Sequence, residues 1–99
     1  MTALCQAPRK VVAAPRFRVP PGACDCHAHI IGAVSRFPFV EPRSFTPPEA
    51  PVSNYASMLK ALGIARNVIV QPSVYGTDNS CTLAALIELG LDRARGMPR

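Results

Sequence analysis

The sequence predicts an α/β fold in which strands and helices alternate along the chain. Two short runs, residues 23–31 and 66–71, have strand composition, and the second is rich in β-branched side chains. Each run is followed by a segment with apolar residues at helical spacing, over residues 54–62 and 79–89. Alternating strands and helices imply parallel pairing through right-handed crossovers. The resulting βαβα order is the repeating unit of a barrel or of an open α/β sheet.

We expect residues 1–21 to form a flexible basic leader and residues 22–99 to form the folded domain. The leader ends at the step Pro20-Pro21-Gly22, which stops regular structure. It holds four of the 11 basic residues and none of the six acidic ones, so the rest of the chain is nearly neutral. A neutral domain with a short basic arm argues against a nucleic-acid partner. The alternative from another class is a small basic binding module that acts through this leader.

The cysteines and the hydropathy pattern indicate the cellular compartment in which the chain is expected. The four cysteines lack the C-x₂-C pairs of a zinc knuckle, so we expect free thiols that pack in a reducing compartment. Prolines and arginines interrupt the leader before it reaches the apolar length of a signal peptide. No run approaches the length of a membrane span. We therefore expect a cytoplasmic location and no membrane partner.

The first predicted strand contains the strongest chemical signal in the sequence, the segment Asp25-Cys26-His27-Ala28-His29. Side chains alternate along a strand, so we expect Asp25, His27 and His29 on one face. The other face would then pack against helices. It carries Cys24, Cys26, Ala28 and Ile30. Two imidazoles that point the same way can bind one cation or one anionic group.

A long connection with five prolines follows, over residues 32–52. A structureless loop of this length within a compact domain is often functional. Its arginines and aromatics, including Arg36 and Arg43, suit a lid over an anionic substrate. The alternative is a loop that only packs its phenylalanines over the rim of the domain.

The helix over residues 54–62 is expected to begin after Ser53 as N-cap and to end at Gly63. Its apolar stripe is predicted to belong to the core. That stripe consists of Tyr55, Met58, Leu59 and Leu62. The strand over residues 66–71 should then be buried.

The segment after this strand is rich in turn formers, and Ser73 stands first among its hydroxyl side chains. Ser73 can donate a hydrogen bond to a carboxylate or carbonyl of a substrate. Asp78 or Asn79 can cap a second helix that runs to Leu89 and stops at Gly90. The apolar side of this helix is expected to comprise Leu83, Leu86, Ile87 and Leu89. The last nine residues are expected to trail off.

Four segments together resemble the start of the 2-pyrone-4,6-dicarboxylate lactonases, members of the amidohydrolase superfamily of metal-dependent hydrolases. These segments are 22–29, 36–39, 62–73 and 75–79. The resemblance implies a (β/α)₈ TIM barrel, of which this chain is the N-terminal βαβα portion and is incomplete. It also implies hydrolysis of a lactone or similar ester of a dicarboxylate in aromatic-acid catabolism, and hence a small anionic carboxylate substrate.

The resemblance further implies roles for particular residues. His27 and His29 would be catalytic and lie at the reacting carbonyl, and Ser73 would contact the substrate. Phe45 stands where a substrate-contacting tyrosine is expected. The aspartate that activates water, a further histidine and the substrate-binding arginines of the family would lie beyond Gly96, so we expect the chain alone to be inactive.

The lactonases work without a metal, so the resemblance predicts no cofactor. The alternative within the superfamily is a zinc-dependent amidohydrolase or decarboxylase. In that case His27 and His29 would be ligands of Zn²⁺.

Overall fold

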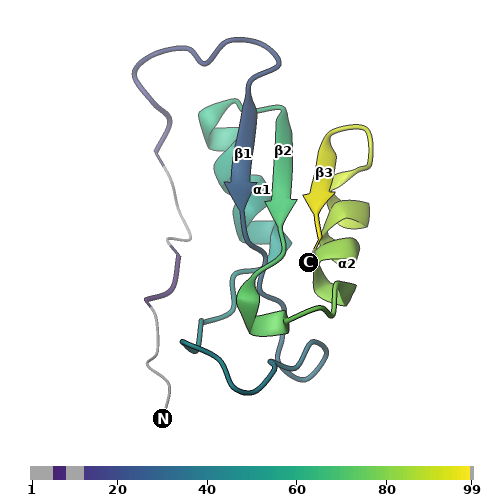
Figure 1. Cartoon of the computed structure of the whole chain (residues 1–99). Helices are drawn as coiled ribbons and strands as arrows, with labels where there is room; N and C mark the ends of the chain where they lie inside the picture. Colours follow the sequence, from purple (N-terminus) through teal and green to yellow (C-terminus); the bar gives the residue numbers. More distant parts are fainter. Residues whose placement is uncertain (1–5, 9–12, 99) are drawn as a thin grey trace.

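A computed structural model of the chain describes residues 6–8 and 13–98. It contains three strands, two α-helices and one short 3₁₀ helix. In chain order these are β1 (Cys24–Ala28), α1 (Val52–Leu62), β2 (Arg66–Val70), η1 (Ser73–Tyr75), α2 (Ser80–Leu89) and β3 (Ala94–Met97). The strands form one parallel sheet in the order β1-β2-β3. Both helices lie on one face of this sheet (Figure 1), so the predicted α/β class is confirmed.

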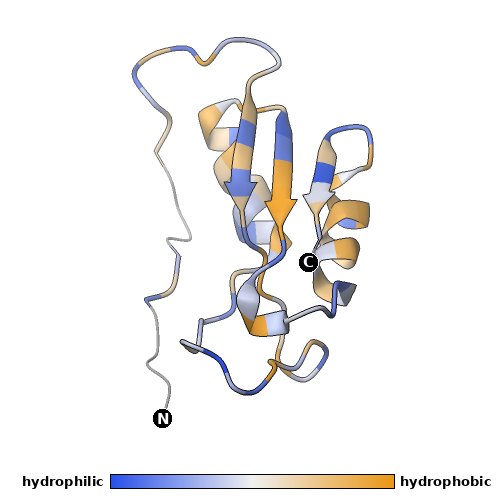
Figure 2. Ribbon diagram, viewed as in Figure 1, coloured by the Kyte–Doolittle hydropathy of each residue, from blue (hydrophilic) through white to orange (hydrophobic). Residues whose placement is uncertain are grey.

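The core lies between β2 and the helices. The second half of β2 and much of α2 are the most apolar parts of the ribbon (Figure 2), and Ile69 of β2 is fully buried. Burying such a side chain stabilises the fold by about 1.5–3 kcal/mol. The buried cluster comprises Ile30, Ile31, Ile69, Val74, Tyr75, Cys81, Ala85, Leu86 and Ala94. The prediction that the strand over residues 66–71 is buried is confirmed for the side that faces the helices, whereas Arg66 is exposed and Val68 and Val70 are partly exposed.

The start of α1 differs from the prediction, and its end agrees with it. The N-cap is Pro51, in an extended conformation with φ −77° and ψ 164°, so the predicted cap at Ser53 is wrong. Proline suits this position because its φ is already fixed near the required value and it has no N–H to leave unpaired. At the other end Gly63 adopts a left-handed φ of 74°, which a residue with a side chain adopts at a cost.

The second helix also buries a different side from the one predicted. Its buried residues are Cys81, Thr82, Ala85 and Leu86. Leu83 and Ile87 instead point outward, with 57% and 72% of their surfaces exposed, so their assignment to the buried side is wrong. The buried face is made largely of small side chains, and these allow α2 to lie close to β2 and β3. The predicted stop at Gly90 is confirmed.

The last residues do not trail off. The segment β3 pairs with β2 in parallel along its length. The N–H of Asn67 donates to the carbonyl of Arg93, and the N–H of Gln71 donates to the carbonyl of Met97, both at 3.0 Å. A short Ala-Arg-Gly-Met run has little strand character of its own, so its pairing with β2 determines its conformation. Among residues 6–8 and 13–98, no helix is long and apolar enough to cross a membrane.

Two isoleucines allow a matched test of this core. We expect Ile69→Val to reduce the free energy of unfolding by about 0.5–1.5 kcal/mol, because it removes one methylene from a filled interior. The same substitution at exposed Ile87 should change it by less than about 0.5 kcal/mol. Urea unfolding followed by circular dichroism measures both values. Equal effects at the two positions would show that β2 is not the centre of the core.

Candidate active site

An irregularity in β1 determines which side chains face the helices. The paired residues are Cys24 with Arg66, Asp25 with Asn67, and Ala28 with Ile69. Between the last two pairs β1 advances three residues while β2 advances two, so β1 contains a bulge with one extra residue. The bulge reverses the alternation of side chains. Asp25 and Ala28 therefore both face the helices, and the prediction that Asp25 shares a face with His27 and His29 is wrong.

The carboxylate of Asp25 has two hydrogen-bond donors near it. Its Oδ2 accepts a hydrogen bond of 2.8 Å from the hydroxyl of Tyr55 on α1. Its Oδ1 lies 3.3 Å from the backbone nitrogen of His27, which donates to it. Burial, followed by the hydrogen bond to Asp25, raises the pKa of Tyr55 well above its ordinary value. Asp25 thus accepts hydrogen bonds both from α1 and from the backbone of the bulge.

The cysteines of β1 lie on the opposite face from the helices. Cys24 and Cys26 are exposed, so the prediction that they pack against helices is wrong. Desolvation and the neighbouring Cys26 thiol raise the pKa of Cys24. Cys81, in contrast, is buried as predicted, and its thiol lies 3.7 Å from the carbonyl of Ile30. Cys5 lies outside the described residues.

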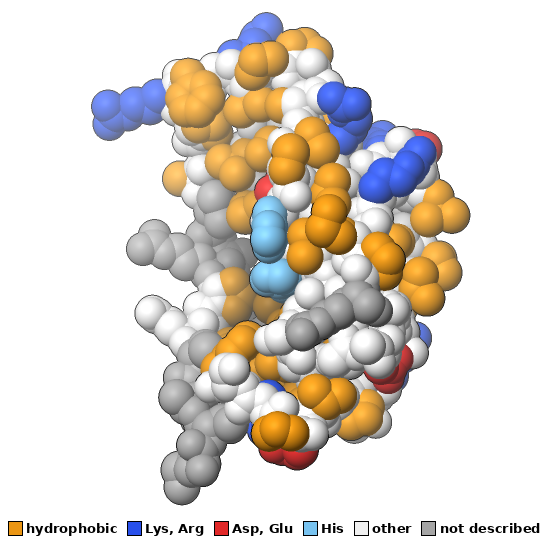
Figure 3. Space-filling view, in the orientation of Figure 1, with side chains coloured by type: hydrophobic (Ala, Val, Ile, Leu, Met, Phe, Trp, Pro, Cys, Tyr) orange, Lys and Arg blue, Asp and Glu red, His pale blue; other side chains and the backbone are white. Residues whose placement is uncertain are grey.

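The two imidazoles lie together on the open face of the sheet. Their ring centroids are 5.0 Å apart and the ring planes cross at 86°. Figure 3 shows them as adjacent pale blue surfaces. The Nδ1 of His29 lies 2.9 Å from the carbonyl oxygen of Val70, the last residue of β2. A carbonyl only accepts, so Nδ1 carries the hydrogen, and in the neutral ring Nε2 keeps a lone pair for another partner.

An open hollow of about 590 Å³ brings the predicted site residues together. His27, His29, Phe45 and Ser73 all line it. The histidines come from the end of β1, Ser73 begins η1 directly after β2, and Phe45 belongs to the long loop. The carboxyl ends of parallel strands meet at one edge of a sheet, where α/β barrels place their active sites.

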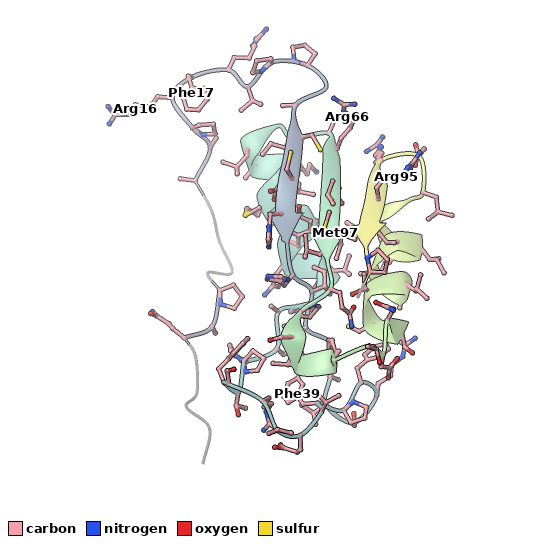
Figure 4. The ribbon with its side chains drawn as sticks, viewed as in Figure 1. Arg16, Phe17, Phe39, Arg66, Arg95 and Met97 are labelled. Atoms are coloured by element: carbon pink, nitrogen blue, oxygen red, sulfur yellow. The ribbon has the colours of Figure 1, made fainter. Side chains whose placement is uncertain are left out.

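The long loop contributes apolar packing to this site and contributes none of its arginines. Phe45 packs against the core, as do Phe37 and Phe39. Arg43 is bonded to Glu41 and Thr46 and lies 5.3 Å from the ring of Phe39, which Figure 4 labels in the loop at the carboxyl end of the sheet. Neither Arg36 nor Arg43 lines the hollow. These contacts favour the packing interpretation of the loop over a charged lid.

Gln71 organises the turn that carries Ser73, a role that the sequence alone did not reveal. Its side chain is buried, and its Nε2 donates to the carbonyls of Gly76 and Asp78 at 3.2 and 2.7 Å. Its Oε1 accepts a bond of 2.6 Å from the hydroxyl of Thr82 on α2. An amide side chain at the end of an apolar run was the available signal, because a buried amide needs several partners.

The site can be tested for its fit to a metal ion. Within residues 6–8 and 13–98, no group of three or more His, Cys, Asp or Glu side chains is arranged to hold one. Catalytic zinc takes three protein ligands. His27 and His29 can supply two, so the described residues do not make a complete zinc site.

Comparison with known proteins identifies relatives of the chain. Residues 24–96 match the family model described as amidohydrolase. The chain is 44% identical to a 4-sulfomuconolactone hydrolase of Rhizobium radiobacter over 82 residues, which are 83% of this chain and 27% of that protein. It is 39% identical to a 2-pyrone-4,6-dicarboxylate hydrolase of Comamonas testosteroni over 83 residues, 84% of this chain and 27% of that protein. The chain thus spans about a quarter of the length of these relatives.

Two solved structures resemble the fold. One is a probable 2-pyrone-4,6-dicarboxylic acid hydrolase of Acinetobacter baumannii with citric acid bound, with a TM-score of 0.70 and 31% identity. The match covers 78% of this chain and 28% of that one. The other is a protein of Agrobacterium tumefaciens, with a TM-score of 0.69 and 25% identity over 92% of this chain and 32% of that one. The three parallel strands and two helices therefore correspond to part of an amidohydrolase-type barrel.

The two tyrosines of the chain give a test of this packing by pH. Burial raises the pKa of Tyr55 and of Tyr75 well above the usual value of about 10. We expect little phenolate absorbance from the folded chain at that pH, whereas the urea-denatured chain should be half ionised. Both pKa values are higher in the folded chain than in the unfolded chain. The contribution of the two tyrosines to the free energy of unfolding is therefore complete below pH ~10 and is lost as the pH rises further. Identical titrations of the folded and denatured chains would contradict the burial of both hydroxyls.

Proposed function

The chain belongs to the amidohydrolase family, and we propose that it supplies the two-histidine wall of an active site that hydrolyses a lactone. The main support is that one hollow is lined by residues from three separate segments, namely His27, His29, Ser73 and Phe45. Two relatives named for lactone or pyrone hydrolysis support the reaction class.

We propose a small carboxylate as the substrate. The relatives are named for 4-sulfomuconolactone and 2-pyrone-4,6-dicarboxylate, and the Acinetobacter structure holds citric acid. Each of these molecules is anionic. In this chain the hydroxyl of Ser73 and the ring nitrogens of the two histidines are the polar side-chain groups proposed to contact it. Phe45 and Val70 provide apolar surface for the ring.

The hydrogen bond to Val70 suggests different roles for the two imidazoles. Neutral His29 presents the lone pair of Nε2, which can accept a hydrogen bond from the attacking water and orient it. His27 is then the ring that donates to the lactone carbonyl and stabilises the negative charge that develops on its oxygen. No carboxylate of the described residues lines the hollow, so the general base is not assigned within this part of the chain.

A chimera tests this proposal. Residues 24–96 would replace the corresponding segment of the Comamonas testosteroni hydrolase, and turnover of 2-pyrone-4,6-dicarboxylate would be measured. We expect the chimera to hydrolyse the lactone, and His27→Ala or His29→Ala to lower kcat about 100-fold or more, because each removes a polar group from the reacting atoms. The isolated chain should show no turnover.

Ser57→Ala is the matched control, since Ser57 is an exposed residue of α1 whose hydroxyl donates to the Ser53 carbonyl at 3.0 Å. It should leave kcat and KM unchanged. A folded chimera that keeps full activity without either imidazole would refute the proposed roles.

Phe45 offers a test in which activity should increase. The resemblance places a substrate-contacting tyrosine at this position, and the ring of Phe45 lines the hollow. In the chimera, Phe45→Tyr is expected to lower KM for 2-pyrone-4,6-dicarboxylate roughly fivefold, because a hydroxyl donor to a charged group contributes about 1 kcal/mol or more. Phe37→Tyr, in the same loop but away from this hollow, is the control. An unchanged or raised KM for Phe45→Tyr would argue against substrate contact at residue 45.

A further inference from the structure

Because of the bulge in β1, His27 has no regular pairing partner on β2. One extra residue lies between the pairs Asp25–Asn67 and Ala28–Ile69. The ladder of hydrogen bonds is interrupted there, and backbone N–H groups at such a break need another acceptor. The Oδ1 of Asp25 lies 3.3 Å from the His27 nitrogen and accepts its hydrogen bond. The side chain of one residue thus supports the backbone that carries a site imidazole.

The carboxylate of Asp25 is itself held from the helix layer. Tyr55 lies on α1, and its hydroxyl donates to Oδ2 over 2.8 Å. The two oxygens of a carboxylate are rigidly linked, so a bond that fixes Oδ2 also fixes the direction of Oδ1. Hydrogen bonds to an ionised acceptor are shorter and stronger than neutral ones. A chain of two bonds therefore runs from α1 to the backbone of His27.

We infer that Tyr55 and Asp25 are positioning residues that stabilise the bulge and thereby direct the His27 imidazole to the same side as that of His29. Neither residue lines the hollow of about 590 Å³; Tyr55 lines a neighbouring cavity of about 310 Å³, which His29 also lines. His29 has its own support in the Val70 carbonyl at 2.9 Å. His27 depends on the Asp25 carboxylate instead, and the 5.0 Å separation of the two rings depends on both supports.

The catalytic importance of this arrangement rests on the proposed function, whereas the geometry can be measured without a substrate. The chain has only two histidines, so its ring signals can be assigned with isotope-labelled histidine. Nuclear Overhauser cross-peaks between the two rings report their separation in the chain itself. Backbone amide spectra of the same samples report whether the fold is intact.

We expect Tyr55→Phe, which removes only the hydroxyl oxygen, to abolish the cross-peaks between the rings while the amide spectrum remains that of a folded chain. Asp25→Ala should do the same. Asp25→Asn keeps an oxygen that accepts from His27 and should preserve them, which is rescue by the conservative variant. Tyr75→Phe is the matched control. It removes a buried tyrosine hydroxyl that accepts from the Gly32 N–H at 3.1 Å, and it should leave the cross-peaks unchanged.

A purely structural role predicts a different outcome. In that case Tyr55→Phe would lower the midpoint of urea unfolding but leave the cross-peaks of the folded molecules intact, and the inference would be overturned. Equal loss in Tyr55→Phe and Tyr75→Phe would also overturn it, since the effect would then not depend on Asp25.

Turnover of the chimera separates this inference from the proposed function. In a chimera that hydrolyses the lactone, Tyr55→Phe is expected to lower kcat about tenfold with little change in KM. The reason is that a displaced imidazole affects the reaction more than it affects substrate binding. A chimera that fails to hydrolyse any lactone would refute the proposed function. The cross-peaks of the Tyr55→Phe chain would still decide the role of Tyr55 and Asp25.

Discussion

Parallel pairing of β1 with β2 is the constraint on which the site depends. Parallel strands end at the same edge of a sheet, so the residues that follow each strand meet there although they are distant in sequence. His29 lies just beyond β1 and bonds to the carbonyl of the last residue of β2. This single bond joins the two strand ends and sets the tautomer of the imidazole. The hollow lined by His27 and Ser73 forms around this junction.

Features with a local cause could be predicted from the sequence. A β-branched run marks β2, and Gly63 ends α1 because the left-handed conformation favours glycine there. The histidines and Ser73 were identified because polar side chains at the ends of predicted strands stand out from their apolar surroundings. Their meeting in one hollow follows from the alternating order of strands and helices, which implies parallel strands.

Features that depend on distant partners could not be predicted in this way. The side of the sheet on which Asp25 lies depends on the bulge in β1. Its hydrogen-bond donor, the hydroxyl of Tyr55, lies 30 residues further along the chain. Strict alternation therefore gave the wrong face for Asp25. Likewise, β3 has little strand propensity and exists because β2 offers it a row of backbone groups. On α2, apolar residues surround the helix, so composition could not distinguish buried Leu86 from exposed Ile87.

The extra residue in β1 has a consequence for how such a strand can change during evolution. A point substitution alters one side chain and keeps the number of residues in the strand unchanged. Deletion of either residue between Asp25 and Ala28 would restore regular pairing, and Asp25 and Ala28 would stay on the helix side because they would then be two positions apart. Only one side chain would then remain on the open face at this point, where Cys26 and His27 now lie. A related chain one residue shorter at this point would therefore keep its acid on the helix side and present one group fewer on the open face.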